Sequence, residues 1–302
     1  MKLLILLALT FLHAAHSQAA PTNSVIDLSI PAPQEPLTDS AVFDESVVFS
    51  PNFAINQNDP QLSDLFDSNG KSNLCFPTSL AETLIYLYGY HTPPLSSLLL
   101  SGLSTDQKSI DPNILVHQLS SICKTSPSNG TFGIDGLKCA LSILSQSGYS
   151  AGKTTLISPF NQDSTLPIQT RPVTIGDIRE AIKSGDPVLL EAAWFSFDPK
   201  TKQWTRANGH YISVFGYDYN NSWGENQIQL KIINPETNYG SSRQNALWDT
   251  VTLVRVSPQP GISYPSNRPF ILTGSGFGGA SKRGFLGMML RVSPSTPSGL
   301  TQ

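Results

Sequence analysis

The chain has 302 residues, with 19 Lys and Arg against 22 Asp and Glu, which gives a formal net charge of −3 at pH 7. Only 14% of the residues are charged and no basic cluster stands out, which argues against a nucleic-acid partner. A chain of this length without an internal repeat suits one large domain with extended arms.

Residues 1–20 have the pattern of a secretory signal peptide. Lys2 precedes an apolar run at 3–12, and small residues follow up to Ala20. The run is too short to cross a bilayer, and we find no other run that is long enough. The sequence therefore predicts an exported protein, secreted or periplasmic, that is cleaved between Ser17 and Ala20, has no membrane association and is a monomer.

Composition divides the rest of the chain into three parts. Residues 21–60 are rich in Pro, Ser, Asn and Asp and hold one apolar patch within 42–49, which predicts an extended arm with one strand laid on the domain. Residues 61–292 carry the periodic patterns of the domain itself, and we expect residues 293–302 to form a flexible tail. The position of residues 21–58 before the domain would also allow a propeptide.

Cys75 opens a segment with helical periodicity. From Ser79 to Tyr88 apolar residues recur three and four apart, which predicts a helix with one buried stripe that ends near Gly89. Pro77 suits the first turn, where no backbone donor is needed. The free N–H groups and the positive end of the helix dipole would favour a thiolate at Cys75. A buried structural cysteine fits the same segment.

Helical patterns dominate the first half of the domain, at Leu95–Leu103, Asn113–Cys123, Asp135–Ser147 and Thr174–Ser184, and residues 150–172 read as a loop. Three cysteines are an odd number for an exported chain. We expect Cys123 and Cys139 to form a disulfide across a helical hairpin, which leaves Cys75 unpaired; two free thiols in a reducing compartment are the alternative. No CxxC or His-rich spacing indicates a metal, and no cofactor is expected.

The second half changes to strand periodicity. The segment Val188–Phe195 is almost wholly apolar, as in a strand buried on both faces. Further strands are predicted at Gly209–Tyr217, Gln227–Asn234, Leu247–Val256, Arg268–Thr273 and Gly284–Val292. Because the helices precede the strands, the sequence predicts an α+β fold with an antiparallel sheet.

Two of these strands form a predicted hairpin that brings a histidine to an asparagine. With the turn near Ser222, the apolar sets match when Val214 faces Leu230 and Ile212 faces Ile232, and His210 then faces Asn234. Directly opposed side chains lie about 4.5–5.5 Å apart at Cβ, so the imidazole can reach the amide oxygen.

The pattern Cys75, His210 and Asn234 is typical of nucleophilic catalysis by a thiol. The histidine takes the thiol proton and later protonates the leaving group, while the asparagine orients the ring. Asn221 is a competing candidate, but it falls in the hairpin turn, far from His210. The other histidines in the domain, His91 and His117, fit structural or surface roles, and a polar pair at the open end of a hairpin would fit His210 and Asn234.

Several motifs together resemble papain-like cysteine peptidases, closest to the free-standing relatives of bacteriocin-processing, double-glycine leader peptidases. They are the helix start at Cys75–Ser79, the helix Thr174–Ser184 followed by Gly185–Val188, the run Gly209–Asp218, and Ile232–Pro235. The resemblance covers about residues 60–240. It implies a helical half that carries the nucleophile, packed on an antiparallel sheet, and a hydrolase that forms a thioester with a peptide or other acyl substrate.

The sequence departs from the family pattern at two positions. Phe76 stands where the family has glycine, which could narrow the cleft or dock a substrate. Asn69 stands where the family has a glutamine that serves as oxyanion donor, and its side chain is one methylene shorter. These departures keep open a catalytically inactive binding module on the same scaffold. The polar, Pro-rich arms alone would also fit a structural or adhesive protein.

Overall fold

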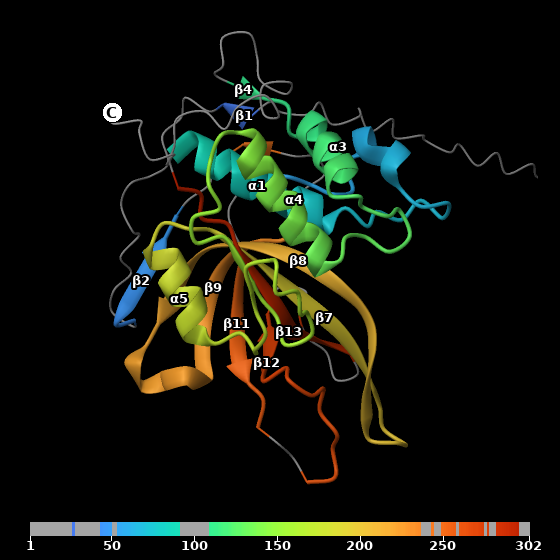
Figure 1. The fold of residues 1–302 in the computed structure, drawn as a ribbon. Helices are drawn as coiled ribbons and strands as arrows, with labels where there is room; N and C mark the ends of the chain where they lie inside the picture. Colours follow the sequence, from blue (N-terminus) through green and yellow to red (C-terminus); the bar gives the residue numbers. More distant parts are fainter. Residues whose placement is uncertain are drawn as a thin grey trace, which may run out of the picture.

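The computed structural model describes residues 26–27, 43–49, 53–90, 109–236, 243–244, 249–257, 260–274, 277 and 282–295 (Figure 1). The predicted signal peptide, His91 and the helix expected at Leu95–Leu103 lie outside the described residues. Within the described ranges, no helix combines the length and apolarity needed to cross a membrane.

The helical half consists of a short 3-10 helix, η1 (Pro60–Leu65), and the helices α1 (Cys75–Tyr90), α3 (Pro112–Ile122) and α4 (Gly133–Gln146). In Figure 1 these helices lie together above the sheet, while α5 (Ile175–Lys183) lies lower, beside it. Local chemistry sets two of the helix starts. The Asp111 side chain accepts from the first N–H groups of α3, and Thr174 and Asp177 form a capping box on α5.

α1 is the central helix and is buried on every side, not along one stripe as the periodicity indicated. Its residues from Phe76 to Leu87 are all buried, including the polar side chains Thr78, Ser79, Glu82 and Thr83. The amphipathic pattern was misleading because α1 packs on other helices and on the sheet at once, so that its polar face also meets protein.

Among the described residues, the main sheet contains nine strands. Eight follow the order β12-β11-β9-β8-β7-β13-β5-β6, and β2 pairs with β8. Their bounds are β2 Glu45–Val48, β5 Thr155–Ile157, β6 Ile168–Gln169, β7 Val188–Asp198, β8 Gln203–Tyr219, β9 Gln227–Ile233, β11 Asp249–Arg255, β12 Phe270–Thr273 and β13 Lys282–Arg291. A pairing of β12 with β13 closes six of the strands into a ring. The fold is therefore α+β, as expected.

The pair β5–β6 corrects the expectation of a loop at 150–172 and of a wholly antiparallel sheet. These two short strands pair in parallel, and β5 adds to the edge of β13. Short strands of two or three residues carry too little periodicity to be recognised in the sequence.

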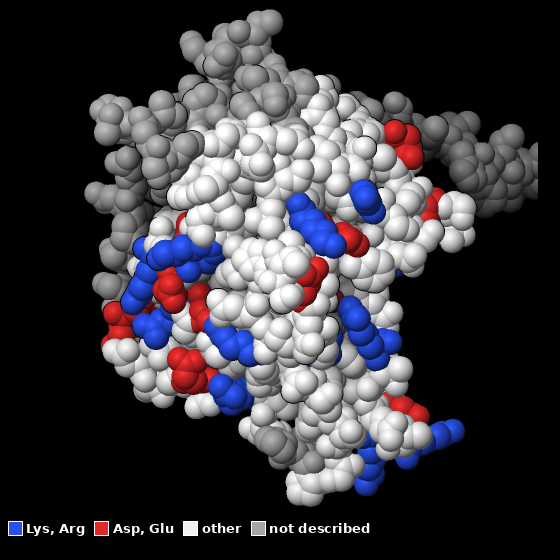
Figure 2. All heavy atoms as spheres, viewed as in Figure 1, with Lys and Arg blue, Asp and Glu red and all other residues white. Residues whose placement is uncertain are grey.

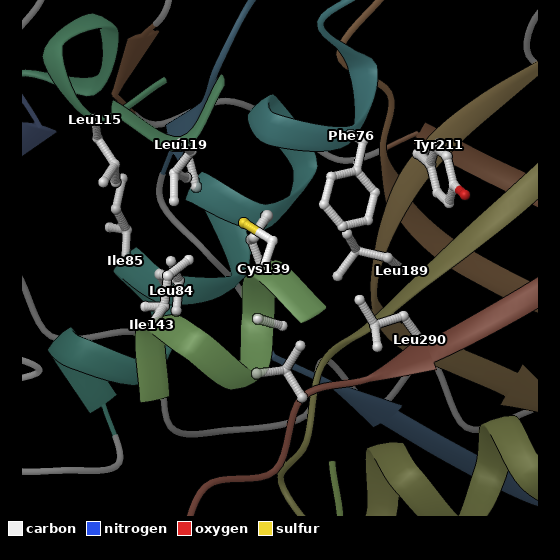
Figure 3. Packing of buried hydrophobic residues seen from close by; sticks show 14 of the residues in the cluster. Phe76, Leu84, Ile85, Leu115, Leu119, Cys139, Ile143, Leu189, Tyr211 and Leu290 are labelled. Atoms are coloured by element: carbon white, nitrogen blue, oxygen red, sulfur yellow. The ribbon is translucent and has the colours of Figure 1, made fainter. Parts of the chain in front are cut away.

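Two apolar cores lie on opposite faces of β7 and β8. One lies between the helices α1, α3 and α4 and the sheet and includes Leu189, Tyr211 and Phe215; Figure 3 shows part of it. The other is built from the opposite side chains of the same strands, with Leu190, Ile212 and residues of α5. Since both faces of these strands are covered, the continuous apolar run of β7 is explained.

The sulfur atoms of Cys123 and Cys139 lie 2.02 Å apart, at disulfide distance, and Cys75 is free. The pair joins the end of α3 to α4 across the connecting loop. Figure 2 shows charged side chains of both signs intermixed on the face it presents, in keeping with the low net charge.

Parts of the predicted arm and tail belong to the compact fold. β2 lies on β8, as expected of one strand of the arm, but β3 (Phe53–Ala54) also pairs with β10 (Arg243–Gln244) and is buried with Ile55. A further pair, β1 (Ile26–Asp27) with β4 (Ser109–Ile110), lies outside the main sheet. The compact part thus begins before residue 61. At the other end, residues 293–295 still bond the domain, since Lys153 N–H donates to the Ser293 carbonyl.

Candidate active site

Cys75 is the first residue of α1 and is partly exposed. The first backbone bond of the helix runs from Thr78 N–H to the Leu74 carbonyl, 3.0 Å, so the N–H groups before it have no acceptor within the helix. The thiol therefore stands at the positive end of the helix dipole, where negative charge is favoured.

Phe76 points away from the thiol into the helical core. It is 1% exposed, and its ring meets Tyr211 edge to face with 5.0 Å between the ring centroids. Figure 3 shows the two side chains next to each other. Gly136 of α4 makes room for it, because a Cβ there would lie 2.4 Å from the Phe76 ring. The bulky residue after the cysteine is thus accommodated inside the protein and does not stand as an exposed group in a cleft.

His210 lies on β8 and is 5% exposed. Its Nε2 lies 2.7 Å from Asn234 Oδ1, just after the end of β9. The same oxygen accepts the backbone N–H of Glu236 at 3.1 Å, which fixes the amide orientation and requires Nε2 to carry the proton. Nδ1 is then the ring nitrogen left for an interaction with the side chain of Cys75, which raises the pKa of His210.

The surroundings of His210 favour its protonated form. Burial lowers the pKa of the imidazole, but the hydrogen bond with Cys75, the charges of Cys75 and Glu236 and the hydrogen bond with Asn234 together raise it above its ordinary value. The Glu236 carboxylate lies 3.9 Å from Nδ1 and is largely exposed. An imidazolium beside a thiol at a helix start is the electrostatic arrangement that activates cysteine nucleophiles.

The hairpin that joins His210 to Asn234 differs in register from the expected one. Val214 pairs with Ile232, not with Leu230, and a bulge follows between Val214 and Gly216. If this register continues toward the open end of the hairpin, residue 236 lies directly opposite His210. Asn234 is then a diagonal neighbour of His210, two residues away from the opposed position. The shift is two residues, so it keeps both side chains on one face, whereas a shift of one would have separated them.

The other polar candidates lie elsewhere. Asn221 is exposed in the turn η2 (Asn221–Asn226), where its backbone N–H donates to Asp44 at 2.7 Å. His117 on α3 contacts the Gln61 carbonyl and Asp64. Asn69 is exposed in a turn, and both its backbone and its side chain bond Asp67. Among the described contacts, none joins Asn69 to Cys75 or His210.

A comparison with protein families places the chain. Residues 53–245, well over half of the chain, match the model of the Peptidase_C39 like family. The chain belongs to this family. No curated protein and no solved structure matches it significantly.

As a member of the Peptidase_C39 like family, the chain has a cysteine-peptidase-type, papain-like fold. The matched region contains Cys75, His210 and Asn234 and begins at β3, in agreement with the burial of residues 53–55. Strands β11, β12 and β13 follow the matched region, although they complete the ring that supports β8.

Two buried glutamates beside the site were not recognised in the sequence. Glu191 on β7 accepts from Arg206 at 2.6 Å, and a Cβ on Gly209 would lie 2.7 Å from its carboxylate. The glycine before His210 therefore makes room for Glu191. The second, Glu82, lies in α1 and is fully buried. A lone acidic residue within an apolar segment gives no sign of such packing. Within the described ranges, no cluster of three or more His, Cys, Asp or Glu could hold a metal ion.

Proposed function

We propose that this protein is an exported cysteine peptidase in which Cys75 is the nucleophile, His210 the general acid and base, and Asn234 the residue that orients the imidazole. One observation carries the proposal: a buried histidine is hydrogen-bonded to an asparagine oxygen and interacts with a cysteine at a helix start, which raises the pKa of the imidazole. Export is supported by the apolar N-terminal run and by the cysteine pair at disulfide distance, because disulfides persist in oxidising compartments.

The proposed reaction has two steps. The Cys75 thiolate attacks the scissile carbonyl, a C–S bond forms, and the C–N bond breaks as His210 gives its proton to the leaving amine. Water then attacks the thioester while His210 takes its proton, which releases the carboxylic acid product and restores the thiolate. The Cys75 backbone N–H is the proposed oxyanion donor, with Asn69 as the second donor if its side chain leaves Asp67.

We propose a peptide as the substrate, in keeping with the peptidase family to which the chain belongs. The first substrates to test are peptides with two glycines before the scissile bond, because of the resemblance to leader peptidases.

The test is selective alkylation. Purified protein is treated with iodoacetamide near pH 6 and the label is mapped by mass spectrometry. We expect Cys75 to react at least about tenfold faster than an unstructured peptide thiol, and His210→Ala to remove the difference. A wild-type Cys75 that reacts like an ordinary thiol would contradict the proposal.

A catalytically inactive binding module is the second candidate, and one observation favours it. The Asn69 side chain bonds Asp67, and no contact among the described residues joins it to Cys75. A binding module predicts that Cys75→Ala retains full biological activity, whereas a peptidase loses hydrolysis altogether. Peptide cleavage by wild-type protein, absent in Cys75→Ala, decides between them.

A further inference from the structure

We propose that Glu82 is a positioning residue of this site: with its carboxyl group protonated it ties the nucleophile helix α1 to the histidine strand β8 through Ser213, and loss of the proton loosens the placement of Cys75 relative to His210. The inference rests on the proposed function for its catalytic consequence. Its structural part stands on the contacts of Glu82 alone.

Glu82 lies where the two catalytic elements meet. It follows Cys75 by about two helical turns, at 3.6 residues per turn, and so lies on the same side of α1. Its side chain has no exposure. Oε2 lies 2.6 Å from Ser213 Oγ on β8, three residues beyond His210, and Oε1 accepts the Ile55 backbone N–H at 3.2 Å. One carboxyl group therefore joins α1, β8 and the segment after β3.

Counting hydrogens indicates which form of Glu82 these contacts require. Ser213 Oγ lies 2.6 Å from Glu82 and 3.1 Å from the Ser79 carbonyl, but a hydroxyl has only one hydrogen. If Glu82 is ionised, Ser213 can satisfy only one of the two acceptors fully. If Glu82 is protonated, it donates to Ser213, which in turn donates to Ser79, and each hydrogen has one acceptor. The protonated carboxyl group thus completes a series of hydrogen bonds that runs from Glu82 of α1 to Ser213 of β8 and back to Ser79 of α1.

The surroundings of Glu82 also favour its protonated form. None of the ion pairs among the described residues involves Glu82. Burial raises the pKa of Glu82 to about 8, against the opposing effects of Ser213, Ile55 and the charge of His210. The carboxyl is therefore protonated at neutral pH.

The charged groups on neighbouring elements are few. α1 itself adds only Cys75 and tyrosines as titratable groups, and β3 adds none. His210 on β8 is the charged group that acts on Glu82, and its positive charge favours the carboxylate. The other titratable residues on β8 and β7 are Arg206, Tyr211, Tyr217, Asp218, Tyr219, Glu191 and Asp198, and α3 adds His117. Glu191 pairs with Arg206, Asp218 pairs with Lys231, and His117 contacts Asp64.

Ionisation would weaken the contact between the two elements. Ser213 would turn to the carboxylate and leave the Ser79 carbonyl, and an unpaired charge would remain in the core. Ser79 Oγ also bonds the Tyr211 carbonyl, at 3.4 Å, so the same part of α1 meets β8 at the residue after His210. A displacement of α1 here would move Cys75, and misplacement by 1 Å costs on the order of 10²-fold in rate.

Direct titration tests the protonation state in the wild-type protein. With ¹³C-labelled glutamate, the Glu82 carboxyl resonance, assigned through bonds, should shift with a midpoint near pH 8. A midpoint below about 5, the ordinary range of a glutamate, would overturn the inference.

Stability gives a second readout that does not depend on activity. The folded-state pKa of Glu82 is raised above its unfolded value of about 4.3, so wild-type protein loses stability as pH rises from there to about 8, and the loss then levels off. Glu82→Gln cannot ionise, yet it can donate to Ser213 and accept from Ile55. Its Tm minus that of wild type should increase between pH 5 and 8. Glu225→Gln, at an exposed position, is the matched control, and its Tm should differ from that of wild type by the same amount at every pH. If the Tm difference for Glu82→Gln is also the same at every pH, the inference is overturned.

Alkylation of Cys75 tests the catalytic part. Glu82→Gln should keep the wild-type iodoacetamide rate within about twofold at pH 6–7 and exceed it above pH 8, while Glu82→Leu, which leaves Ser213 and Ile55 unpaired, should lose on the order of 10²-fold. Equal rates in all three proteins would overturn the positioning role. If the wild-type thiol is unreactive while the stability difference still develops, the proposed hydrolase fails and the protonated link between α1 and β8 stands.

Discussion

At the scale of single residues, the site depends on the two partners of one imidazole. Asn234 holds Nε2 and Cys75 interacts with the ring on its other side. Both raise the pKa of His210, whereas its burial lowers it, so the protonation of this ring depends on its partners. This makes His210 the residue at which the proposed arrangement can be measured most directly.

Cys75→Ala should lower the pKa of His210. The substitution removes the hydrogen bond and the charge that raise it, while burial, which lowers it, remains. An NMR titration of the His210 imidazole in the wild-type protein and in Cys75→Ala gives the two pKa values. The partly exposed His117 serves as the internal reference. An unchanged His210 titration would mean that the thiol and the ring do not interact.

Asn234→Ala should slow alkylation of Cys75 and any peptide hydrolysis, on the order of 10²-fold, because the ring loses the partner that fixes its tautomer and orientation. Asn221→Ala is the matched control, since Asn221 lies in the exposed turn η2. Equal effects of the two substitutions would show that Asn234 has no special role.

At the scale of elements, the placement of α1 is decided by packing on both of its sides. Phe76 fits against α4 only because residue 136 is glycine, and Ser79 and Glu82 meet β8 through hydrogen bonds. The helix α1 is therefore held by an apolar contact on one side and by hydrogen bonds on the other.

Gly136→Ala should destabilise the fold by about 1–3 kcal/mol, because its methyl group would overlap the Phe76 ring. Thermal or urea unfolding measures the change, and Phe76→Leu in the same chain should recover part of it. Gly176→Ala on α5, where the nearest atom lies 3.6 Å from the new Cβ, is the control and should be neutral or slightly stabilising. If Gly136→Ala were as harmless as the control, the contact between α1 and α4 would be looser than described.

At the scale of the whole molecule, the central strands β7 and β8 are covered on both faces by apolar cores. The helical core lies on one face of β7 and β8 and the ring interior on the other, while the cysteine pair joins the end of α3 to α4 within the helical layer. The stability of that layer should therefore depend on oxidation.

Cys123→Ala combined with Cys139→Ala should lower the free energy of unfolding by about 3 kcal/mol, since the cysteines are 16 residues apart in the sequence. Dithiothreitol should lower the Tm of the wild-type protein and leave that of the double variant unchanged. Equal responses to the reductant would show that no disulfide is present.

Apolar periodicity was enough to predict most of the secondary-structure elements, among them α1, α5, β7 and β9. Alternation along two strands also put His210 on the same face as Asn234, because the face on which a strand residue lies depends only on odd or even spacing. The register of that hairpin, the direction of Phe76 and the buried contacts of Glu82 and Glu191 came from the folded structure alone. The hairpin register depends on a bulge, the direction of Phe76 on a glycine in another helix, and the burial of each glutamate on a partner in another segment. All three depend on residues that are distant in the sequence, and local periodicity does not encode such contacts.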